Sequence, residues 1–497
     1  MTIYSAYFDG SFCTIYNLPH YLIEELTLLL KLDIELDFYK SIKSKSSCPI
    51  SLPFIDSPSL IRINNSDVSF LSGLIAKVHN YLWSKHNINL SYQPLYLNFD
   101  YPSLHLSAFL YTHQISIVNT ATKYKRGIIQ SPTASGKTVS IAELCRIFIQ
   151  TGKVLITVPT ITLLYQMKHD IEAFCHLGNY PVFDIGLIGD GNLNLDKSLT
   201  IAIPDTLINR IDSSDPSVLH FLNTRNVLIA DECHYCPTPT YLQLIQYMKS
   251  RRISLGFSAT PWSNLGANLI LEGMFGPKII NITESDMIQK GVIMQPKFEF
   301  HTAPKISLPP KLLSQDYSHW VYNQLYNLAI TTNKSRNNLI TKLVSDYINT
   351  QQGPILIIVN KVGTTGKSKV SHAQILYDLL LNQGFVLPIL HGQISSKQQD
   401  EVLSLIKDYK IPGIIGSAKL LTAGVNIKNL SALCIAGGGR SDKNQIQQVG
   451  RILRTNLGKS QPIVFDIVDT QSYFAGQSQF RINTAIDIYG SDCVTII

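Results

Sequence analysis

The sequence predicts an α/β protein whose core consists of parallel β-sheets, with a smaller α+β domain ahead of it. A short apolar strand, Gly127–Gln130, precedes a tight loop of small residues and a helical stretch, Val139–Gln150. A second apolar run, Asn226–Ala230, ends in two acids, at the position where parallel sheets place their ligands. Hydrophobic residues make up 45% of the 497 residues and charged residues only 15%, which fits strands covered on both faces.

Residues 1–104 are expected to form the small α+β domain. Ile3–Phe8 and Phe12–Tyr16 indicate a β-hairpin, whereas Pro19–Leu32 and Val68–Trp83 indicate helices. This segment carries seven Lys and Arg against nine Asp and Glu, so the chain's net charge of +7 arises from the remaining residues. The domain is either a DNA-binding module or a structural or partner-docking cap.

The loop Ser131–Thr138 has the form of a phosphate-binding loop. Its sequence matches G-x-x-x-x-G-K-[ST] except at the first position, which is serine. Backbone N–H groups of such a loop, with the N-terminus of the next helix, face an anion. We expect Ser135, Gly136 and Lys137 to hold the phosphates of ATP, and the Thr138 hydroxyl to ligate Mg²⁺. The alternative is a chance Gly-Lys-Thr in a surface turn.

The two acids after the second strand are candidates for catalysis. Asp231 and Glu232 begin the sequence Asp-Glu-Cys-His. Asp231 is expected to hold Mg²⁺ on the phosphates and Glu232 to orient and polarise the attacking water, roles that suit phosphoryl transfer. Two acids after an apolar strand also occur at the start of a solvated loop. Their order after the phosphate loop favours the catalytic interpretation.

The order and spacing of these motifs resemble those of superfamily 2 helicases and translocases. Ser258-Ala-Thr260 and Gln447-Gln-Val-Gly-Arg-Ile-Leu-Arg454 also stand where that superfamily has motifs, and the match extends over about residues 105 to 470. The resemblance implies two tandem RecA-like lobes with ATP bound between them. Lys137, Asp231 and Glu232 would belong to the first lobe. Arg451 and Arg454 would act as arginine fingers on the γ-phosphate.

Further positions in the first lobe resemble family motifs. Gln114 corresponds to the glutamine that reads adenine ahead of the phosphate loop. Thr160, in Val158–Gln166, and Thr206 and Arg210, in Ile203–Arg210, stand where the family contacts the nucleic-acid backbone. Each of these segments is also compatible with an ordinary strand-to-loop junction.

The second lobe contains the remaining motifs that the resemblance identifies. Asn426 stands where the family usually has aspartate, which puts a ribose contact there in doubt. The residues assigned to nucleotide binding in this lobe are Gly424 and Gln447, and those assigned to nucleic-acid contacts are Asn360, Lys361, His391, Gly392 and Thr422.

Two other patterns resemble a second phosphate loop and a zinc site, and we interpret neither as a site of that kind. Lys361–Ser368 follows an apolar strand and precedes a helical stretch, as a second phosphate loop would, but it begins with lysine and no acid pair follows it. We interpret it as an extended loop that either contacts phosphates or is solvated. Cys233 and Cys236 have the spacing of a metal knuckle, yet no second pair answers them, so we expect no zinc site.

The predicted domains are residues 1–104, a first lobe of residues 105–290, a second lobe of residues 291–475, and a tail of residues 476–497 that packs on the second lobe. The second lobe should begin with the strand Gly291–Phe300, and Tyr317–Thr350 should be helical. No apolar run is long enough to span a bilayer, and the N-terminus lacks the features of a signal peptide.

A small α+β domain ahead of such a motor resembles the arrangement in UvsW-type recombination helicases of tailed phages. The function implied is an ATP- and Mg²⁺-dependent DNA helicase or translocase that branch-migrates forks and junctions during recombination or replication restart. We expect it to be a cytoplasmic monomer, in the host cytoplasm if a phage encodes it, that holds DNA by backbone contacts. The alternatives are an RNA helicase, which shares every motor motif, and a nucleotide-gated nucleic-acid-binding module that displaces no strand.

Overall fold

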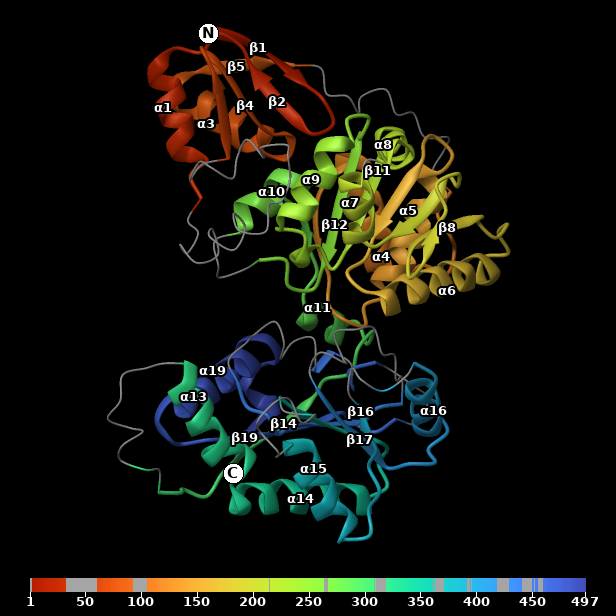
Figure 1. Ribbon diagram of the computed structural model, residues 1–497, viewed down its shortest axis with the longest axis vertical. Coiled ribbons are helices and arrows are strands. Elements are labelled where there is room, and N and C mark those ends of the chain that lie inside the picture. Colours follow the sequence, from red (N-terminus) through yellow and green to blue (C-terminus); the bar gives the residue numbers. More distant parts are fainter. Residues whose placement is uncertain are drawn as a thin grey trace. The chain divides into compact units, whose positions relative to one another are not determined.

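The computed structural model describes residues 2–32, 60–92, 105–213, 215–262, 267–307, 309, 319–360, 362, 371–390, 394, 396–417, 429–439, 449–450, 452–454 and 459–497. The chain forms two compact units (Figure 1). The first comprises Met1–Pro132 and Gly136–Ile282, and the second comprises Thr283–Ile497 with the loop residues Thr133–Ser135. No helix in the described ranges is long and apolar enough to cross a membrane.

The first unit begins with a five-stranded sheet in the order β3-β4-β2-β1-β5. Only β1 and β5 run parallel; the other neighbours are antiparallel. The expected hairpin is present as β1 and β2. Buried leucines and isoleucines of α1 and α3 form the apolar core with the sheet. The elements are β1 (Thr2–Phe8), β2 (Phe12–Ile15), α1 (His20–Leu29), β3 (Ile61–Asn64), β4 (Asp67–Leu71), η1 (Ser72–Leu74), α3 (Ile75–His86) and β5 (Ile88–Ser91).

The prediction of one helix over Val68–Trp83 was wrong in its first part. Val68–Leu71 belong to β4, which pairs with β2 and β3, and the helix α3 begins only at Ile75. Val68 and Phe70 point into the core while Ser69 is half-buried, a period-two pattern of β-branched and aromatic residues that favours a strand. A turn at Asn65, whose φ is 56°, joins β3 to β4.

The main sheet of the first unit has eight strands in the order β13-β6-β12-β11-β7-β10-β8-β9. All neighbours are parallel except β8 and β9. Its central strands are buried from end to end, as expected for strands covered on both faces. The strands are β6 (Arg126–Gln130), β7 (Val154–Thr157), β8 (Ile185–Gly189), β9 (Asn192–Leu193), β10 (Leu199–Ala202), β11 (Val227–Asp231), β12 (Ile253–Ser258) and β13 (Lys278–Asn281).

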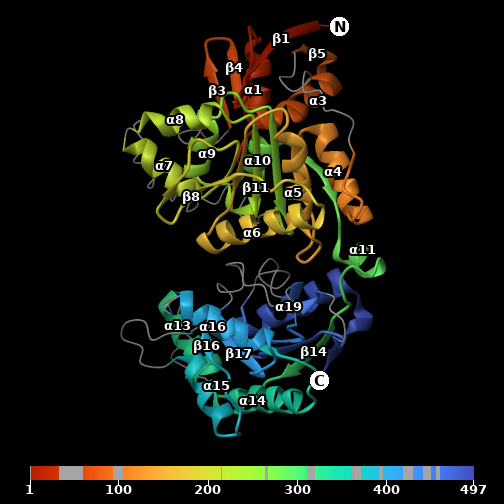
Figure 2. The ribbon, with the colours of Figure 1, turned by 90° about the vertical axis from the view of Figure 1, so that its right-hand side faces the viewer.

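Helices cover both faces of this sheet (Figure 2). One face carries α7 to α10, which share a single apolar cluster with Ile128, Leu155 and Leu228 of the strands. The helix α5 packs against both α4 and α6. The helices are α4 (Thr112–Tyr124), α5 (Lys137–Phe148), α6 (Ile161–Leu177), α7 (Pro204–Asp212), α8 (Pro216–Asn223), α9 (Pro239–Tyr247) and α10 (Asn268–Phe275), with a 3-10 turn η2 (Cys233–Tyr235) after β11.

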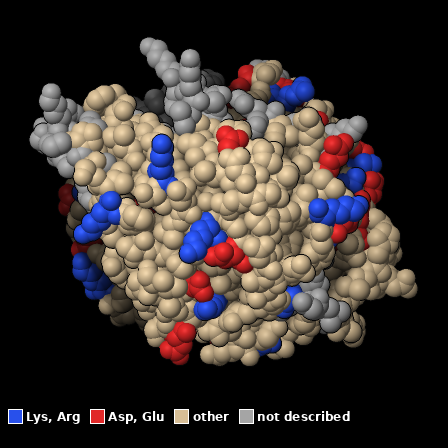
Figure 3. Space-filling view, turned by 90° about the horizontal axis from the view of Figure 1, so that it is seen from below, with Lys and Arg blue, Asp and Glu red and all other residues tan. Residues whose placement is uncertain are grey.

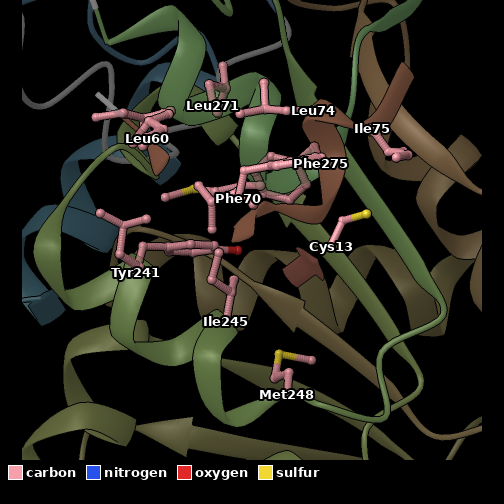
Figure 4. Packing of buried hydrophobic residues seen from close by; sticks show 14 of the residues in the cluster. Cys13, Leu60, Phe70, Leu74, Ile75, Tyr241, Ile245, Met248, Leu271 and Phe275 are labelled. Carbon is pink, nitrogen blue, oxygen red and sulfur yellow. The ribbon is translucent and has the colours of Figure 1, made fainter. Parts of the chain in front are cut away.

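The N-terminal sheet and the main sheet share one hydrophobic core. Phe70 and Leu74 of the first lie in the same cluster as Leu271 and Phe275 of α10 (Figure 4). The carbonyl oxygen of Gly10, in the turn between β1 and β2, accepts hydrogen bonds from Arg126 Nη2 (3.1 Å) and Arg251 Nη2 (2.8 Å). The N-terminal segment is therefore joined to the main sheet by buried apolar and polar contacts.

The second unit is built on a seven-stranded sheet in the order β16-β17-β15-β18-β19-β14-β20. All of its strand pairs are parallel. With the first unit, this sheet confirms the predicted fold class, two parallel-sheet lobes preceded by a small α+β region. The strands are β14 (Lys297–Thr302), β15 (Ile355–Val359), β16 (Ile389–Leu390), β17 (Gly413–Ser417), β18 (Ala432–Ile435), β19 (Ile463–Val468) and β20 (Val494–Ile496).

The last residues of the chain complete the second sheet. The helix α19 (Ser472–Tyr489) leads through η4 (Ser491–Cys493) into β20, which pairs with β14. The segment expected to be a tail therefore contributes an edge strand. The other helices are α11 (Glu284–Gln289), α13 (His319–Tyr326), α14 (Lys334–Asn349), α15 (His372–Leu381) and α16 (Ser396–Lys407), with a π-helical turn η3 (Asn327–Thr331) between α13 and α14.

The end of the molecule that carries α14 and α15 is mainly uncharged. Figure 3 shows this end with Lys, Arg, Asp and Glu scattered singly or in small mixed groups. Lys334, Lys342 and Asp346 are the exposed charged residues of α14, and Arg336 is buried. Among the described residues in this view, Lys and Arg form no stripe of the kind that binds a polyanion.

Candidate active site

The predicted phosphate loop connects β6 to the N-terminus of α5. Ala134 (φ 69°) and Gly136 (φ 78°) both adopt left-handed backbone conformations, a geometry that allows successive N–H groups to converge on an anion. A Cβ atom at Gly136 would lie 2.5 Å from Gln114 Nε2, and the positive φ is one that side chains rarely adopt, so the position favours glycine. The loop therefore has the form of a cradle for phosphate.

Gln114 is tied to this loop. Its Oε1 accepts a hydrogen bond from the backbone N–H of Tyr111 (2.9 Å), and its Nε2 donates to the carbonyl oxygen of Gly136 (3.3 Å). Only 3% of Gln114 is exposed, so it is not the solvated polar residue that its position alone would allow. Tyr111, which the sequence did not single out, is 61% exposed and its ring is stacked on that of His113.

Lys137 connects the loop to the acidic motif. Its Nζ lies 3.4 Å from the carbonyl oxygen of Ser131 and 3.7 Å from Glu232 Oε1. Ser131 replaces the first glycine of the usual pattern, and it is fully buried with its N–H bonded to the carbonyl oxygen of Ser258. The serine is therefore accommodated within the sheet-to-loop junction, and the loop keeps its form.

The two acids stand at the carboxyl end of β11. Asp231 is 9% exposed, and burial, together with the Glu232 carboxylate, raises the pKa of Asp231 to about 7, an effect that the Lys137 ammonium partly offsets. Glu232 has a left-handed backbone (φ 51°), which is uncommon for a residue with a side chain and costs about 1 kcal/mol or more. Its N–H donates to Asp231 Oδ1 (3.0 Å). Such backbone strain is frequent at functional sites.

His234 links the acids to the next strand. Its Nδ1 lies 3.3 Å from Glu232 Oε2 and 2.9 Å from Ser258 Oγ. Ser258 Oγ in turn accepts a hydrogen bond from the N–H of Thr260 (3.1 Å). The sequence placed Ser258-Ala-Thr260 among the motifs but assigned no role to His234. The feature of the sequence that could have indicated a role for His234 is its position two residues after Glu232.

The donor set fits a magnesium nucleotide. Asp231, Glu232 and the Thr138 hydroxyl are hard oxygen groups, which suit Mg²⁺. Thr138 is the second residue of α5 and is half-buried. The described residues contain no cluster of three or more His, Cys, Asp or Glu side chains suited to a metal. A metal here would therefore depend on phosphate oxygens as well, which is how Mg²⁺ usually binds with nucleotides.

A pocket of about 220 Å³ adjoins the acids in the first unit. Its wall includes Asp231 and Glu232, the residues that follow β7 and β10, and Tyr235, Cys236, Thr238 and Tyr241 near the start of α9. Thr160 directly follows the wall residue Pro159, and Thr206 directly follows Asp205. The pocket thus separates the acids from the two segments expected to contact nucleic acid.

The predicted nucleic-acid residues of the first unit occupy helix ends. Thr160 is the N-cap of α6, and its Oγ1 accepts a hydrogen bond from the N–H of Leu163 (3.3 Å). Thr206 lies in the first turn of α7, and Arg210 is exposed in the last turn of that helix. Helix N-termini bind phosphate groups readily, so the positions of Thr160 and Thr206 are compatible with backbone contacts.

In the second unit the structure describes two of the predicted site residues. Asn360 follows β15, and its Nδ2 donates to the carbonyl oxygen of Gly437 (2.9 Å). Arg454 forms an isolated antiparallel bridge with Ile293. The other assigned residues, Lys361, His391, Gly392, Thr422, Gly424, Gln447 and Arg451, lie outside the described residues, as do Asn426 and all of Lys361–Ser368 except Val362.

Two protein families match the chain, one in each unit. Residues 107–263 match the family "Type III restriction enzyme, res subunit", and residues 336–456 match "Helicase conserved C-terminal domain". The chain is 22% identical to the ATP-dependent DNA helicase uvsW of Enterobacteria phage T4 over 352 residues, which cover 70% of this chain and 66% of the phage protein. It thus spans just under two thirds of that relative's length.

Solved structures share the fold. The ATP-dependent Type ISP restriction-modification enzyme LlaBIII bound to DNA matches with a TM-score of 0.56 at 12% identity, covering 84% of this chain and 34% of that one. S. cerevisiae Dbp5 bound to RNA and ADP BeF3 matches with a TM-score of 0.51 at 15% identity, covering 75% and 85%. The fold is therefore shared by proteins solved with DNA and with RNA.

Proposed function

Because the chain belongs to the superfamily 2 helicases, we propose that it is an ATP-dependent DNA helicase or translocase that remodels branched DNA such as forks and junctions. The observation that carries the proposal is the continuous contact from the phosphate loop to the acids: Lys137 Nζ lies between Ser131 O and Glu232 Oε1. This arrangement brings a phosphate cradle, a cation and two carboxylates together at the carboxyl ends of β6 and β11, the two strands that flank β12 in the sheet.

In the proposed reaction each group has a distinct role. The loop N–H groups and Lys137 bind the β- and γ-phosphates, and Thr138 and Asp231 would hold the metal. Bound Mg²⁺ would neutralise charge that develops on the phosphates during transfer. Glu232 orients the attacking water, and its carboxylate is held near Lys137 Nζ (3.7 Å) and His234 Nδ1 (3.3 Å). Arg451 and Arg454 stabilise the transferring phosphoryl group, as arginine fingers do in phosphate-loop enzymes.

The nucleotide state reaches the DNA through the ends of β11 and β12. His234 contacts Glu232 and Ser258, so a change in the Glu232 carboxylate when water or phosphate leaves alters the hydrogen bonds of Ser258 and Thr260. Thr160, Thr206 and Arg210 hold the strand by its phosphates and read no base. Affinity for DNA should therefore fall steeply as salt concentration rises.

The N-terminal domain binds the branched part of the substrate in this proposal. Its shared core with the first lobe supports the idea, because a domain joined by buried contacts moves with that lobe during each cycle. The domain carries two more acids than bases, so its contribution is expected to be positioning of the branch point and not strong phosphate binding.

The decisive experiment compares ATP hydrolysis and strand displacement on single-stranded DNA, forked DNA, a four-way junction and a matched RNA fork. We expect all DNA ligands to stimulate hydrolysis, and the fork and junction to be resolved fastest. Lys137→Ala should abolish both activities. Stimulation by RNA alone would establish the RNA-helicase alternative, for which the Dbp5-like fold is the supporting observation. Hydrolysis without displacement of any strand would establish the nucleotide-gated binding module.

A further inference from the structure

A second pocket of the first unit lies where the N-terminal region meets the edge of the main sheet. It has a volume of about 360 Å³, within the range of about 300–1,000 Å³ that is usual for small-ligand sites. Its wall comes from η1 and the start of α3, and from the end of α4, the start of β6 and the turn between α10 and β13. It shares none of its described wall residues with the pocket beside Asp231 and Glu232, so it is a separate site.

The charged groups of this wall are positive. Arg126 and Lys278 lie in it, and the described part of the wall contains no carboxylate. Arg126 is only 7% exposed. Its Nη2 donates to the carbonyl oxygen of Gly10 (3.1 Å), and its guanidinium carbon lies 5.2 Å from the centre of the Phe8 ring. A fixed, desolvated guanidinium in the wall favours an anionic ligand.

A second buried guanidinium adds to the positive potential at Arg126. Arg251 is fully buried, and its Nε and Nη2 donate to the same carbonyl oxygen of Gly10 (3.2 Å and 2.8 Å). The pKa of Arg251 is lowered, first by burial and then by the like charge of Arg126. Because like charges held close together repel each other, an anion bound beside Arg126 would offset part of that repulsion.

The rest of the wall suits a flat, largely apolar group. Ile75, Pro277 and Ile279 give it an apolar surface. The ring of Tyr124, at the end of α4, is also in the wall and is 50% exposed. Lys123 Nζ lies 5.2 Å from the centre of that ring, so a further cation stands beside the aromatic surface.

This combination of groups matches the chemistry of a single nucleic-acid strand. Proteins bind such strands by stacking their bases on aromatic side chains and pairing their phosphates with cations. A nucleotide with an unpaired base can enter a pocket of about 360 Å³. A duplex cannot, because its bases are paired and stacked inside the double helix.

We propose that this pocket binds one nucleotide of single-stranded DNA, with the base stacked on Tyr124 and the phosphate beside Arg126. The inference rests on the proposed function, in which Thr160, Thr206 and Arg210 hold the strand along which the motor moves; the pocket holds the other strand of a fork. The two sites lie at opposite ends of the main-sheet strands, because Arg126 begins β6 whereas Thr160 and Thr206 follow β7 and β10. Strands held in this way cannot re-anneal while both are bound.

The test compares the affinity for a fork with two single-stranded arms with the affinity for forks that lack one arm or the other. Stacking of one base changes affinity by about tenfold, so the wild type should prefer the two-armed fork by about that factor. Tyr124→Ala should remove the preference, and Tyr124→Phe, which keeps the ring, should retain it. Fluorescence anisotropy of labelled DNA measures each affinity. A preference that survives in Tyr124→Ala overturns the inference.

A change of charge tests the phosphate part of the site. Ala76 is an exposed wall residue on α3. Ala76→Glu should weaken binding of the two-armed fork about fivefold, because the carboxylate repels a phosphate nearby, whereas Ala76→Lys should match or exceed the wild type. The matched control is Ala173→Glu, at an exposed position of α6, a helix that contacts β8 and β10 at the other edge of the sheet. Equal losses in the two glutamate variants overturn the inference.

Two further outcomes are decisive. Free thymidine monophosphate that abolishes the fork preference at concentrations near that of the DNA would show a mononucleotide site and overturn the assignment to a strand. A wild type whose hydrolysis is stimulated by single-stranded DNA, but which does not prefer the two-armed fork, would overturn this inference and leave the proposed function standing. A wild type whose hydrolysis equals that of Lys137→Ala would instead refute the proposed function.

Discussion

The two lobes build the polar groups that follow their strands in different ways. In the first lobe, these groups lie in short sequence motifs on loops that directly follow strands, as in Glu232, whose N–H is bonded to Asp231. In the second lobe, the carbonyl oxygens of Ala436 and Gly439, which follow β18, are held by Arg336 and Arg481, side chains that lie far away in the sequence. The first set is visible in sequence motifs, whereas the second is brought together by tertiary structure alone.

This difference predicts that single changes in the first lobe remove chemistry while leaving the fold intact. Glu232→Gln should retain ATP binding and lose turnover by about 100- to 10,000-fold, because the amide keeps the size of the side chain but cannot accept a proton. Glutamine has a similar conformational cost at φ 51°, so stability should change little. Binding is measured with a fluorescent ATP analogue and turnover by phosphate release. Near-normal hydrolysis would remove Glu232 from the catalytic role.

The same difference explains which of these residues could be predicted from the sequence. Lys137, Asp231 and Glu232 could be grouped from the sequence because each lies in a short motif whose residues are adjacent in space as well as in sequence. Arg336 and Arg481 carry no motif, and they pair with Asp469 and Asp466. Nothing local in the sequence shows that the two arginines reach the carbonyl oxygens of Ala436 and Gly439, since that depends on the order of strands in the second sheet.

The N-terminal region gives a second example. The alternation of residues and Gly10 suffice to predict the hairpin of β1 and β2, but the sequence pattern hides β4 because only the short turn η1 separates Val68–Leu71 from α3. The sequence does not indicate the union with the first lobe either. That contact depends on Gly73, which no motif in the sequence distinguishes from the other glycines. It also depends on the hydrogen bonds that Arg126 and Arg251 donate to the carbonyl oxygen of Gly10.

A second prediction tests that union. A Cβ atom at Gly73 would lie 2.3 Å from the carbonyl oxygen of Glu272 and 2.6 Å from that of Gly273, both backbone atoms of α10. Gly73→Ala should therefore lower the free energy of unfolding by about 1–3 kcal/mol, the usual cost of overpacking. Urea denaturation followed by fluorescence measures it.

The matched control for Gly73→Ala lies in the second lobe. A Cβ atom at Gly476, inside α19, would have no neighbouring atom within 4 Å, so Gly476→Ala should be neutral or stabilise the protein by about 1 kcal/mol through helix propensity. If Gly73→Ala were as stable as the wild type, α10 and η1 would not be in the close backbone contact that joins the two parts of the first unit.

A third prediction concerns pH and Asp231. Because the pKa of this carboxyl is raised to about 7, it is mostly protonated at pH 6 and mostly ionised at pH 8. A metal ligand must be deprotonated, so binding of the magnesium nucleotide should release a proton and weaken by about tenfold for each pH unit below 7. The profile should level off above pH 7. Nucleotide affinity measured by calorimetry from pH 5.5 to 8.5 checks it.

The control for the pH profile is Asp231→Asn, which cannot ionise. Its affinity for the magnesium nucleotide should be low and nearly independent of pH across the same range. A wild-type profile that is flat between pH 5.5 and 7 would mean that the metal does not require the ionised carboxylate, and Asp231 would lose its assignment as a magnesium ligand.

The smallest expected effect separates ATP hydrolysis from the coupling of hydrolysis to strand displacement. His234→Ala removes the side chain that lies 2.9 Å from Ser258 Oγ and 3.3 Å from Glu232 Oε2. One hydrogen bond contributes about 1 kcal/mol, so we expect about a fivefold loss of strands displaced per ATP hydrolysed, with a smaller loss of hydrolysis itself. The control Tyr235→Phe keeps the ring that lies 4.2 Å from the imidazole and should behave as the wild type. Equal losses of both activities in His234→Ala would show that His234 serves Glu232 alone, and the path from the acids to Ser258 and Thr260 would then not couple hydrolysis to movement along DNA.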